Sequence, residues 1–376
     1  MAEEREPARV EDAEPVAPRA RSGAALWWML ALLWFAGVAA GWLWFFAARA
    51  EETRAAAARD AWMKTVAEVA AVQRRAQTET VEPARLMADV EALAFERYTL
   101  EQRRQARAHI AHRLTAMGYT PDLHGYSTGV NVLAERPGTD PGARAILVAA
   151  HFDTVAGSPG ADDNASGVAV VLEVARRLRD RPTRRPLALA FFDEEEQGLV
   201  GSRQYAASPL RVEALAGVVV VEMAGHVCRE KGCQRVPPGL PGGIAPETGD
   251  FIAVIGDAEH LELLAAFRRA SGPPDGAGGR PPVFALPVPE KGDVLPDTRR
   301  SDHSPFWDRG VGAVMVTDTA ELRNPHYHRA SDTPETLDPV FLAGVAAIVV
   351  DAVTILLDAP EADQSRSGAP RGKSGR

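Results

Sequence analysis

Cysteine is nearly absent from this chain, which has two cysteines in 376 residues. So few cysteines exclude a scaffold built from several disulfides, and the two do not form the C-x-x-C pair that would suggest a thiolate metal site. An excess of basic residues is also missing, because 42 Lys and Arg stand against 51 Asp and Glu, a formal net charge of −9. This balance argues against nucleic acid as the partner of the chain.

Charged residues are missing from one long stretch near the N-terminus, between Ser22 and Ala48. Its central part, Leu26–Phe46, has the length of about 20 apolar residues that a helix needs to span a bilayer. Tryptophans at both ends of the run, such as Trp27 and Trp44, are typical of the aromatic belts of membrane helices. We therefore predict a transmembrane helix over residues 22–48.

A cleaved signal peptide is the alternative interpretation of the same run, since Ala48-Arg49-Ala50 resembles a cleavage site. The apolar core of a signal peptide is normally about 7–15 residues, which is shorter than the run found here. Arginines flank both ends of the run, so the positive-inside rule is nearly balanced. We expect a single-pass membrane protein with its large domain on the extracytoplasmic side.

The rest of the chain divides by composition. The overall content of 46% hydrophobic and 25% charged residues is that of a packed globular chain. Residues 1–21 mix Pro, Ala, Glu and Arg without apolar periodicity and are predicted to be a disordered tail. Residues 49–81 are rich in Ala, Arg and Glu and predict a helical stalk. A folded domain is expected over 82–358, and a flexible tail over 359–376.

Short apolar runs alternate with amphipathic segments inside the expected domain. Helical spacing of apolar residues predicts helices over Gln102–Met117 and Ser166–Leu178. The pattern predicts an α/β fold with a mostly parallel central sheet covered by helices on both faces, in which ligands bind beyond the carboxyl ends of the strands. The expected strands are Ala145–Ala150, Leu187–Phe192, Gly217–Val221, Phe251–Ile255 and Val311–Thr317.

Histidines and carboxylates follow several of these runs. Carboxylates gathered at one sheet edge raise one another's pKa, and the usual remedy is a bound cation. Histidine with carboxylate ligands suits zinc, and a carboxylate shared by two ions would offset more of the charge. The residues in question are His151, Asp153, Asp162, Asp163, Asp193, Glu194, Glu195, Glu196, Glu222, His326 and His328.

The order of these residues resembles the M28 family of zinc peptidases, which includes aminopeptidases with two co-catalytic zinc ions. The resemblance covers roughly 89–357 and implies the zinc-aminopeptidase-like α/β fold. The motifs that carry it are His151-Phe-Asp153, Gly160-Ala-Asp162-Asp163-Asn-Ala-Ser-Gly167, Glu195-Glu196-Gln-Gly-Leu-Val-Gly-Ser202, Ser301-Asp-His303 and His328-Arg-Ala-Ser-Asp332-Thr333.

The resemblance also implies roles for individual residues. Glu195 matches the general base, and Asp153 matches the aspartate that holds the first histidine. Asp162 matches the aspartate that bridges the metals, and a cis peptide is then expected between Asp162 and Asp163. Glu222 stands where many members have Asp, which leaves the identity of the metal open. The five metal ligands implied for two zinc ions are His151, Asp162, Glu196, Glu222 and His328.

Other residues near these motifs are candidates for the substrate pocket. His226 follows Glu222 by four residues, and His303 lies within a family motif, so both are expected at the pocket wall. Cys228 and Cys233 lie in a Gly/Pro-rich loop and are expected either to form a disulfide at the pocket rim or to remain two free thiols.

The function that the resemblance implies is a metal-dependent exopeptidase that acts on peptides, an aminopeptidase by preference. A carboxypeptidase is an alternative, since Arg299 or Arg300 could hold a substrate carboxylate. A single-zinc enzyme like the glutaminyl cyclases is another. A membrane ectodomain that uses the fold only for binding is the alternative from a different class, although the complete set of ligands argues against it.

Overall fold

The structure is a computed structural model that describes residues 24–74, 80–241, 243–273 and 276–360. The chain divides into two compact units between Asp60 and Ala61, inside the long helix α1 (Ala24–Ala70). The tail predicted for residues 1–21 and nearly all of the tail predicted for 359–376 fall outside the described residues.

Helix α1 contains both the predicted membrane span and the beginning of the predicted stalk. The apolar half is long and hydrophobic enough to cross a membrane by length and composition. Its large side chains are exposed, as Trp27 at 75% illustrates. A second helix, α9 (Pro339–Asp358), passes the same test, but 83% of its apolar window is buried, which makes it a core helix.

The folded unit begins earlier than the sequence predicted. Its N-terminal segment, residues 61–70, is the last part of α1, where the indole Nε1 of Trp62 donates to the carbonyl of Pro287 at 2.7 Å. Val69 is buried against the core of the domain. The end of the predicted stalk is therefore a part of the folded unit.

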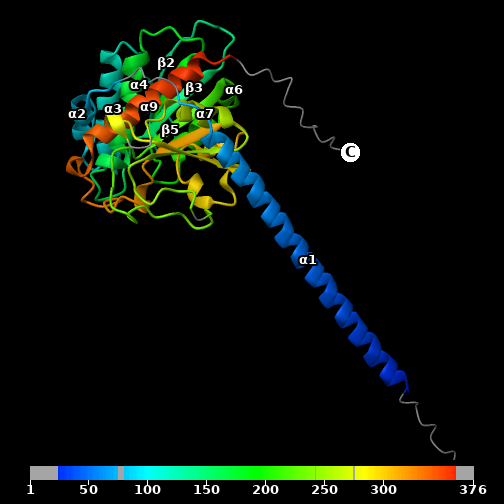
Figure 1. Cartoon of the computed structure of the whole chain (residues 1–376). Helices are drawn as coiled ribbons and strands as arrows, with labels where there is room; N and C mark the ends of the chain where they lie inside the picture. The colour runs from blue at the N-terminus through cyan, green and yellow to red at the C-terminus, as the bar shows by residue number, and fades with distance from the viewer. Residues whose placement is uncertain (1–23, 75–79, 242, 274–275, 361–376) are drawn as a thin grey trace, which may run out of the picture. The chain divides into compact units, whose positions relative to one another are not determined.

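A sheet of eight strands forms the centre of this unit, in the order β1-β2-β4-β3-β5-β8-β6-β7 (Figure 1). Strands β4, β3, β5 and β8 are parallel neighbours. Strands β1 and β2 are added antiparallel at one side, and β6 and β7 form a parallel pair that runs antiparallel to β8 at the other. The strands are β1 (Asp122–Gly125), β2 (Val130–Arg136), β3 (Ala145–His151), β4 (Leu187–Phe192), β5 (Leu215–Glu222), β6 (Ile252–Asp257), β7 (Val283–Val288) and β8 (Ala313–Thr317).

All five predicted strands are present, and the mostly parallel α/β sheet is confirmed. Strands β1, β2 and β7 were not predicted. Strand β2 mixes polar residues such as Asn131 with apolar ones, and β7 contains Pro287, which is tolerated at a sheet edge because it donates no ladder hydrogen bond.

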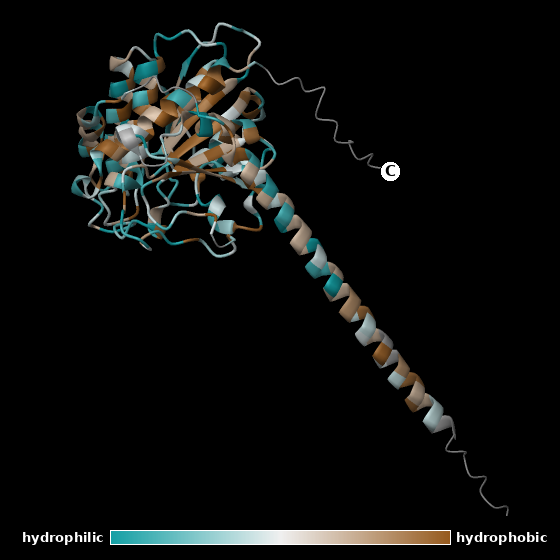
Figure 2. Cartoon of the chain, in the orientation of Figure 1, coloured by the Kyte–Doolittle hydropathy of each residue, from teal (hydrophilic) through white to brown (hydrophobic). Residues whose placement is uncertain are grey.

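Helices cover both faces of the sheet because the central strands are apolar on both sides. In β3, Ile146 and Val148 belong to one core cluster, and Leu147 and Ala149 belong to the other. Figure 2 shows these central strands as hydrophobic. The first cluster includes side chains of α2 (Pro83–Leu93), α3 (Leu100–Ala116), α4 (Gly167–Leu178), α7 (Leu261–Ala270) and α9, and the second includes side chains of α5 (Val200–Ala206), α6 (Pro209–Glu213), α8 (Ser304–Trp307) and the end of α1.

Candidate metal centre

The carboxyl ends of the parallel strands bring the predicted acidic and histidine residues together. His151 is the last residue of β3, and Glu222 is the last residue of β5. Glu195 and Glu196 follow β4 after a short turn. Because parallel neighbours end at the same edge of the sheet, these side chains gather there, as the sequence pattern predicted.

Asp163 lies at the centre of this group. Its Oδ1 is 3.3 Å from Nε2 of His151, and its Oδ2 is 3.2 Å from Nε2 of His328. The side chain is 3% exposed. One carboxylate therefore joins two histidines that are far apart in the sequence.

Two sets of side chains surround Asp163. On one side, Nε2 of His151 is 3.4 Å from Oε2 of Glu222, and Glu195 has an oxygen within 4.8 Å of both. On the other side, Nε2 of His328 is 3.1 Å from Oε2 of Glu196. The ligand atoms of Asp163, Glu196 and His328 lie within 4.8 Å of one another. The arrangement offers two adjacent positions for cations with one carboxylate between them.

The prediction that Asp162 bridges these positions is wrong. Its Oδ1 accepts a hydrogen bond from the backbone N–H of Gly225 at 2.9 Å, and its Oδ2 accepts one from Nδ2 of Asn324 at 2.7 Å. Burial and the nearby Asp318 raise the pKa of Asp162 well above its usual value. Asp162 and Asp163 are neighbours in a tight helical turn, Ala161–Ser166, and their side chains contact different partners.

The cis peptide bond also lies one residue later than expected. It was expected between Asp162 and Asp163, and it lies between Asp163 and Asn164. The carboxylate of Asp332 holds the turn from outside, because its two oxygens accept the backbone N–H groups of Asp162 and Asp163 at 2.9 and 3.1 Å.

Asp153 links three parts of the site. Its Oδ1 is 3.3 Å from Nδ1 of His151, on the side of the imidazole ring away from Asp163. The same carboxylate accepts the backbone N–H groups of Glu195 at 3.0 Å and Glu196 at 3.2 Å. Asp153 therefore lies against the imidazole that it was expected to hold, and its hydrogen bonds position both glutamates.

The acidic run after β4 divides into two pairs with different surroundings. Asp193 and Glu194 form ion pairs with the buried Arg103 at 2.8 and 2.9 Å. Glu194 has a positive φ of 61°, so the backbone turns between this pair and the next. Glu195 and Glu196 therefore face the histidines, while their two predecessors stabilise the fold.

The pKa values of the cluster reflect its burial and crowding. Burial raises the pKa of Glu195 well above its usual value, although His151 acts in the opposite direction. Burial and then Asp163 raise the pKa of Glu196 to about 7. Burial opposes the charge of His328, but hydrogen bonds to Asp163 and Glu196 outweigh it and raise the pKa of His328 to about 10. In the metal-free protein these groups hold protons that a metal ion would displace.

The residues fit a divalent metal such as zinc. Two imidazoles and several carboxylates are a donor set that zinc prefers. The Oε1 atom of Glu196 is buried and has no hydrogen-bond partner in the structure. A buried polar atom without a partner is costly, and coordination to an ion would satisfy it.

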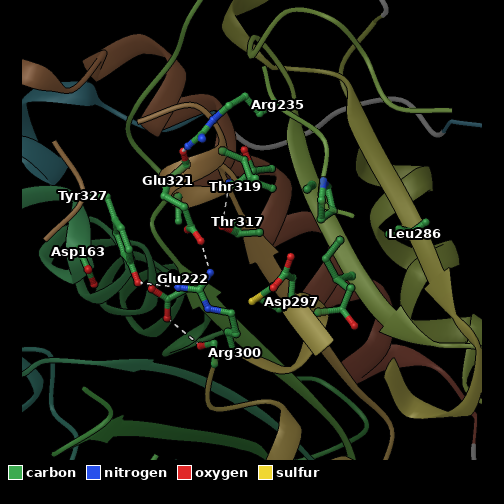
Figure 3. A pocket seen from close by; sticks show the side chains of 18 of the residues that line it. Asp163, Glu222, Arg235, Leu286, Asp297, Arg300, Thr317, Thr319, Glu321 and Tyr327 are labelled. Carbon is green, nitrogen blue, oxygen red and sulfur yellow. Dashed lines mark hydrogen bonds and ion pairs between the residues drawn. The ribbon is translucent and has the colours of Figure 1, made fainter. Parts of the chain in front are cut away.

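A pocket of 470 Å³ opens beside the cluster (Figure 3). Asp163 and Glu222 lie on one side of it, and Leu286 lies on the other. Its apolar floor belongs to three adjacent strands, because Ile255 of β6 pairs with Leu286 of β7 and with Met315 of β8. The apolar side chains of this floor are Phe251, Ala253, Ile255, Phe284, Leu286 and Met315.

Neither histidine expected at the pocket wall lines this pocket. His303 is fully buried, its Nε2 is 2.7 Å from the carbonyl oxygen of Thr298, and its ring lies edge-on to Trp307. His226 bonds the carbonyl of Thr336 through Nδ1 at 3.1 Å. Both predictions are corrected, since each ring makes a hydrogen bond to a backbone carbonyl and neither side chain belongs to the pocket lining.

The rim of the pocket is formed by the loop between Cys228 and Gly249, whose backbones pair with each other. Cys228 and Cys233 form a disulfide, which decides between the two expectations for these residues. The loop supplies Gln234, Arg235, Pro237, Leu240 and Ala245 to the pocket lining.

Three contributions to the site were not predicted. The hydroxyl of Ser301 donates to Oε2 of Glu222 at 2.7 Å. The ring of Tyr327 stacks on His328, with centroids 3.7 Å apart. Arg300 forms an ion pair with Glu321 and donates to the hydroxyl of Tyr327 at 3.2 Å (Figure 3). Ser301 had a signal in the sequence, since it begins one of the quoted motifs, whereas Arg300 was considered only as a holder of a substrate carboxylate.

Two comparisons with known sequences support these observations. Residues 131–249 match the family described as Peptidase family M28. The chain is similar to the uncharacterized protein YfbL of Escherichia coli, with 32% identity over 225 residues, 56% of this chain and 66% of YfbL. It is also similar to a protein of Pyricularia oryzae named "Probable zinc metalloprotease", with 30% identity over 269 residues, 61% of this chain and 50% of that protein. The chain thus spans less than two thirds of the length of these relatives.

Solved structures share the fold. The LapA aminopeptidase of Legionella pneumophila has a TM-score of 0.58 at 20% identity, covering 75% of this chain and 73% of that one. The glutaminyl cyclase of Fimbriiglobus ruber has a TM-score of 0.53 at 17% identity, covering 75% of this chain and 98% of that one. At these identities the likeness concerns the fold alone. The sequence match and the ordered motifs at the sheet edge identify residues 131–249 as a region of the Peptidase family M28 type.

Proposed function

We propose that the protein is an aminopeptidase that uses two zinc ions, held at the two positions joined by Asp163. The observation that carries the proposal is that the two oxygens of Asp163 face one histidine each, at 3.3 and 3.2 Å. His151 and Glu222 would hold one ion, and Glu196 and His328 would hold the other. Co-catalytic metals in hydrolases lie about 3.5–4 Å apart, a spacing that one shared carboxylate allows.

Bound zinc would supply a water of lowered pKa, near 7, and would polarise the scissile carbonyl. Glu195 is the general base of the proposal, because its buried carboxylate adjoins the first position and is not needed to complete the second. It takes the proton of the attacking water and delivers it to the leaving amine. Asp153 fixes the imidazole of His151 and the backbone of Glu195, so the base and the first ligand keep their separation.

The pocket favours substrates with a large apolar side chain next to the scissile bond. Its floor is a section of sheet where Ala253 of β6 lies between Phe284 of β7 and Thr317 of β8. Ala253 has the smallest side chain among the strand residues of this floor, and its pairing partners Phe284 and Thr317 are larger. Burial of a substrate side chain against this apolar floor contributes about 25 cal/mol of binding free energy for each Å² of apolar surface removed from water.

The carboxypeptidase alternative receives less support from the two arginines considered for it. Arg299 forms an ion pair with Asp308 and donates to the carbonyl of Lys291 at 2.6 Å. Arg300 is paired with Glu321. A substrate carboxylate would have to compete with these acidic partners, so we favour recognition of a free amino terminus.

Metal analysis of Asp162→Asn and Asp163→Asn tests the proposal. The wild-type protein and Asp162→Asn are expected to retain two zinc ions per chain after dialysis, and Asp163→Asn is expected to retain fewer. A panel of peptides with free or blocked termini, assayed with and without a chelator, identifies the reaction. Two tightly held ions in Asp163→Asn would contradict the assignment, and a single ion in the wild type would favour the cyclase-like alternative.

We also propose that the apolar half of α1 anchors the protein in a membrane, with the folded unit on the extracytoplasmic side. The disulfide between Cys228 and Cys233 supports that side, because disulfides persist in oxidising compartments. Alkaline carbonate extraction of membranes tests the anchor, and protease accessibility in intact cells tests the orientation. Release by carbonate would contradict a membrane-spanning helix and favour a cleaved signal sequence.

A further inference from the structure

Arg97 is a buried arginine beneath the metal centre whose side chain the catalytic proposal does not use. It lies between α2 and α3 and is 0% exposed. Among the described residues, it takes part in no ion pair within 4.0 Å. Burying a guanidinium that has no ion-pair partner costs several kcal/mol, even where hydrogen bonds offset part of the cost. A guanidinium in this position therefore calls for a physical explanation.

The hydrogen bonds of Arg97 join the two segments that carry the central aspartates of the site. Its Nε donates to the carbonyl of Phe152 at 2.6 Å, next to Asp153 in the chain. Its Nη1 and Nη2 donate to the carbonyls of Pro159 at 2.7 Å and Gly160 at 2.9 Å, at the start of the turn that carries Asp163.

Further bonds fix the guanidinium itself. Nη1 also donates to the carbonyls of Leu93 and Phe95, where α2 ends. The backbone N–H of Arg97 donates to Oγ1 of Thr154 at 2.9 Å. Arg97 is thus tied to the end of α2 as well as to the segment 152–154.

The packing around this connection is close. Gly160 has a positive φ of 63°, and a Cβ added to it would lie 2.6 Å from Nη2 of Arg97 and 2.3 Å from the carbonyl oxygen of Asp163. A side chain at position 160 would therefore push the guanidinium and the turn apart. Because the guanidinium is planar and rigid, it sets the distance between the carbonyls that it bridges.

We propose that Arg97 is a positioning residue of the metal centre, which holds Asp153 and Asp163 at the separation that two zinc ions require. This inference rests on the proposed function. Arg97 acts through the backbone of segments 152–154 and 159–163 and does not contact substrate. Residues that orient metal ligands typically change metal affinity by 10–100-fold when they are replaced.

A purely electrostatic role gives the opposite expectation. A fixed positive charge near the site repels a cation, so its removal alone would strengthen zinc binding. Arg97→Met removes both the charge and the hydrogen bonds, whereas Arg97→Lys keeps the charge but loses the planar fork. The direction of the change in zinc affinity therefore separates positioning from repulsion.

The experiment measures the zinc dissociation constants of the full-length protein in detergent by competition with a chromophoric chelator, at a temperature where circular dichroism shows each variant folded. Arg97→Met is expected to bind zinc about 10–100-fold more weakly than the wild type, and Arg97→Lys to fall between them. With zinc at saturation, KM is expected to stay within threefold, since the pocket is not altered.

Arg280→Met is the matched control for the loss of a buried arginine. Arg280 is 4% exposed and pairs with Asp351 of α9 at 2.7 Å. Its replacement is expected to lower the melting temperature without changing zinc affinity. If Arg97→Met does not fold, Thr154→Val removes one bond of the same connection with little change in volume, and a threefold or greater loss of zinc affinity is expected.

Unchanged or tighter zinc binding in folded Arg97→Met would overturn the inference, as would unchanged binding in Thr154→Val when Arg97→Met fails to fold. A loss of zinc affinity in Arg280→Met equal to that in Arg97→Met would overturn it too, because the effect would then follow stability alone. Failure of the proposed function is distinguishable, since the wild-type protein itself would then bind no zinc pair.

Discussion

Adjacent residues of the same type have different roles in this site. Asp162 and Asp163 are both buried, but one accepts hydrogen bonds from Gly225 and Asn324 and the other faces two histidines. The motif predicted that an aspartate of this turn would be central. It could not show which one, because the choice depends on backbone angles inside the turn, where Asp163 and Asn164 are not helical.

Glu195→Gln is expected to lower kcat by 10²–10⁴-fold while both zinc ions stay bound, because the amide cannot accept the proton of the attacking water. Steady-state kinetics with metal analysis of the same sample checks this result. Glu194→Gln is the matched control from the same acidic run, since Glu194 bonds Arg103 and Thr128 and does not face the metal positions. A kcat in Glu195→Gln equal to that of the control would remove Glu195 from the role of base.

Ala253→Leu is expected to reduce the space that the pocket floor leaves for a substrate side chain. We expect kcat/KM for substrates with an N-terminal Phe or Leu to fall by 10-fold or more, and kcat/KM for those with Ala to change by less than threefold. A few methylenes of apolar contact account for a change of this size. The measurement is kcat/KM over a series of aminoacyl substrates.

The control for this substitution is Ala285→Leu, which adds the same volume on the opposite face of the sheet, where Ala285 is 7% exposed and belongs to the first core cluster. It is expected to change the stability of the protein but not the ratio of kcat/KM between substrates with an N-terminal Phe and those with an N-terminal Ala. An equal loss of kcat/KM for all substrates in Ala253→Leu would show that the substrate side chain does not lie against this floor.

At the scale of elements, the rim loop is held by its own closure and by hydrogen bonds that Gln234 and Arg235 form with the segment 319–323. It is closed by the disulfide and by the backbone pairing of Cys228 with Gly249. Arg323 supports it from below by donating to the carbonyls of Gly249 and Phe251 at 2.7 and 3.0 Å.

Replacing both cysteines by serine is expected to raise KM several-fold with a smaller effect on kcat, because the loop lines the pocket but holds no metal ligand. Kinetics of the double variant check this, and dithiothreitol treatment of the wild type should reproduce it. The double variant under dithiothreitol is the control for effects of the reductant on zinc. A change in kcat with an unaltered KM would contradict a role for the ring in substrate binding.

Helices and central strands could be predicted from the sequence because their apolar periodicity is strong, as in Leu187–Phe192, whose predicted and observed bounds agree. The direction of β6 could not be predicted. Its apolar run has the same pattern as those of β3 and β5, and only pairing with β8 shows that it is antiparallel. Ala253 and Ile255 were not predicted as pocket residues for this reason, since they lie within a strand and not at its end.

For the whole molecule, the buried His303 is expected to make stability depend on pH. Burial lowers the pKa of His303 to about 4, below the value of about 6.5 in the unfolded chain. The unfolded state then binds more protons between these values, so stability is full above pH 6.5 and is lost as the pH falls toward 4. The loss from this group is about 2 kcal/mol between pH 7 and pH 5, at 1.36 kcal/mol per unit of pKa.

Denaturant unfolding of the wild type and His303→Gln at both pH values measures this contribution. Between pH 7 and pH 5, the free energy of unfolding is expected to fall by about 2 kcal/mol more in the wild type than in the variant. Comparing the change with pH, not the absolute stability, cancels the cost of the substitution itself. Equal pH dependence in the two proteins would show that His303 is not held neutral in the folded state.

The sequence predicted that most residues of the candidate metal centre lie close together, because residues at strand ends follow directly from the topology, as His151 and Glu222 show. It did not predict residues that act through tertiary contacts alone. Arg97 and Tyr327 are examples, since nothing in their local sequence indicates that they meet the carbonyl of Phe152 or the ring of His328.

The antiparallel pair β6 and β7 has a consequence for how specificity can change. The strands that end in metal ligands are β3 and β5, whereas Ala253, Ile255, Phe284 and Leu286 come from β6 and β7. In the proposed enzyme, we therefore expect side-chain selectivity to be encoded in a part of the chain separate from the hydrolytic residues. Randomising these four positions should yield variants with new preferences and intact turnover, so this edge of the sheet is the place to redesign the enzyme.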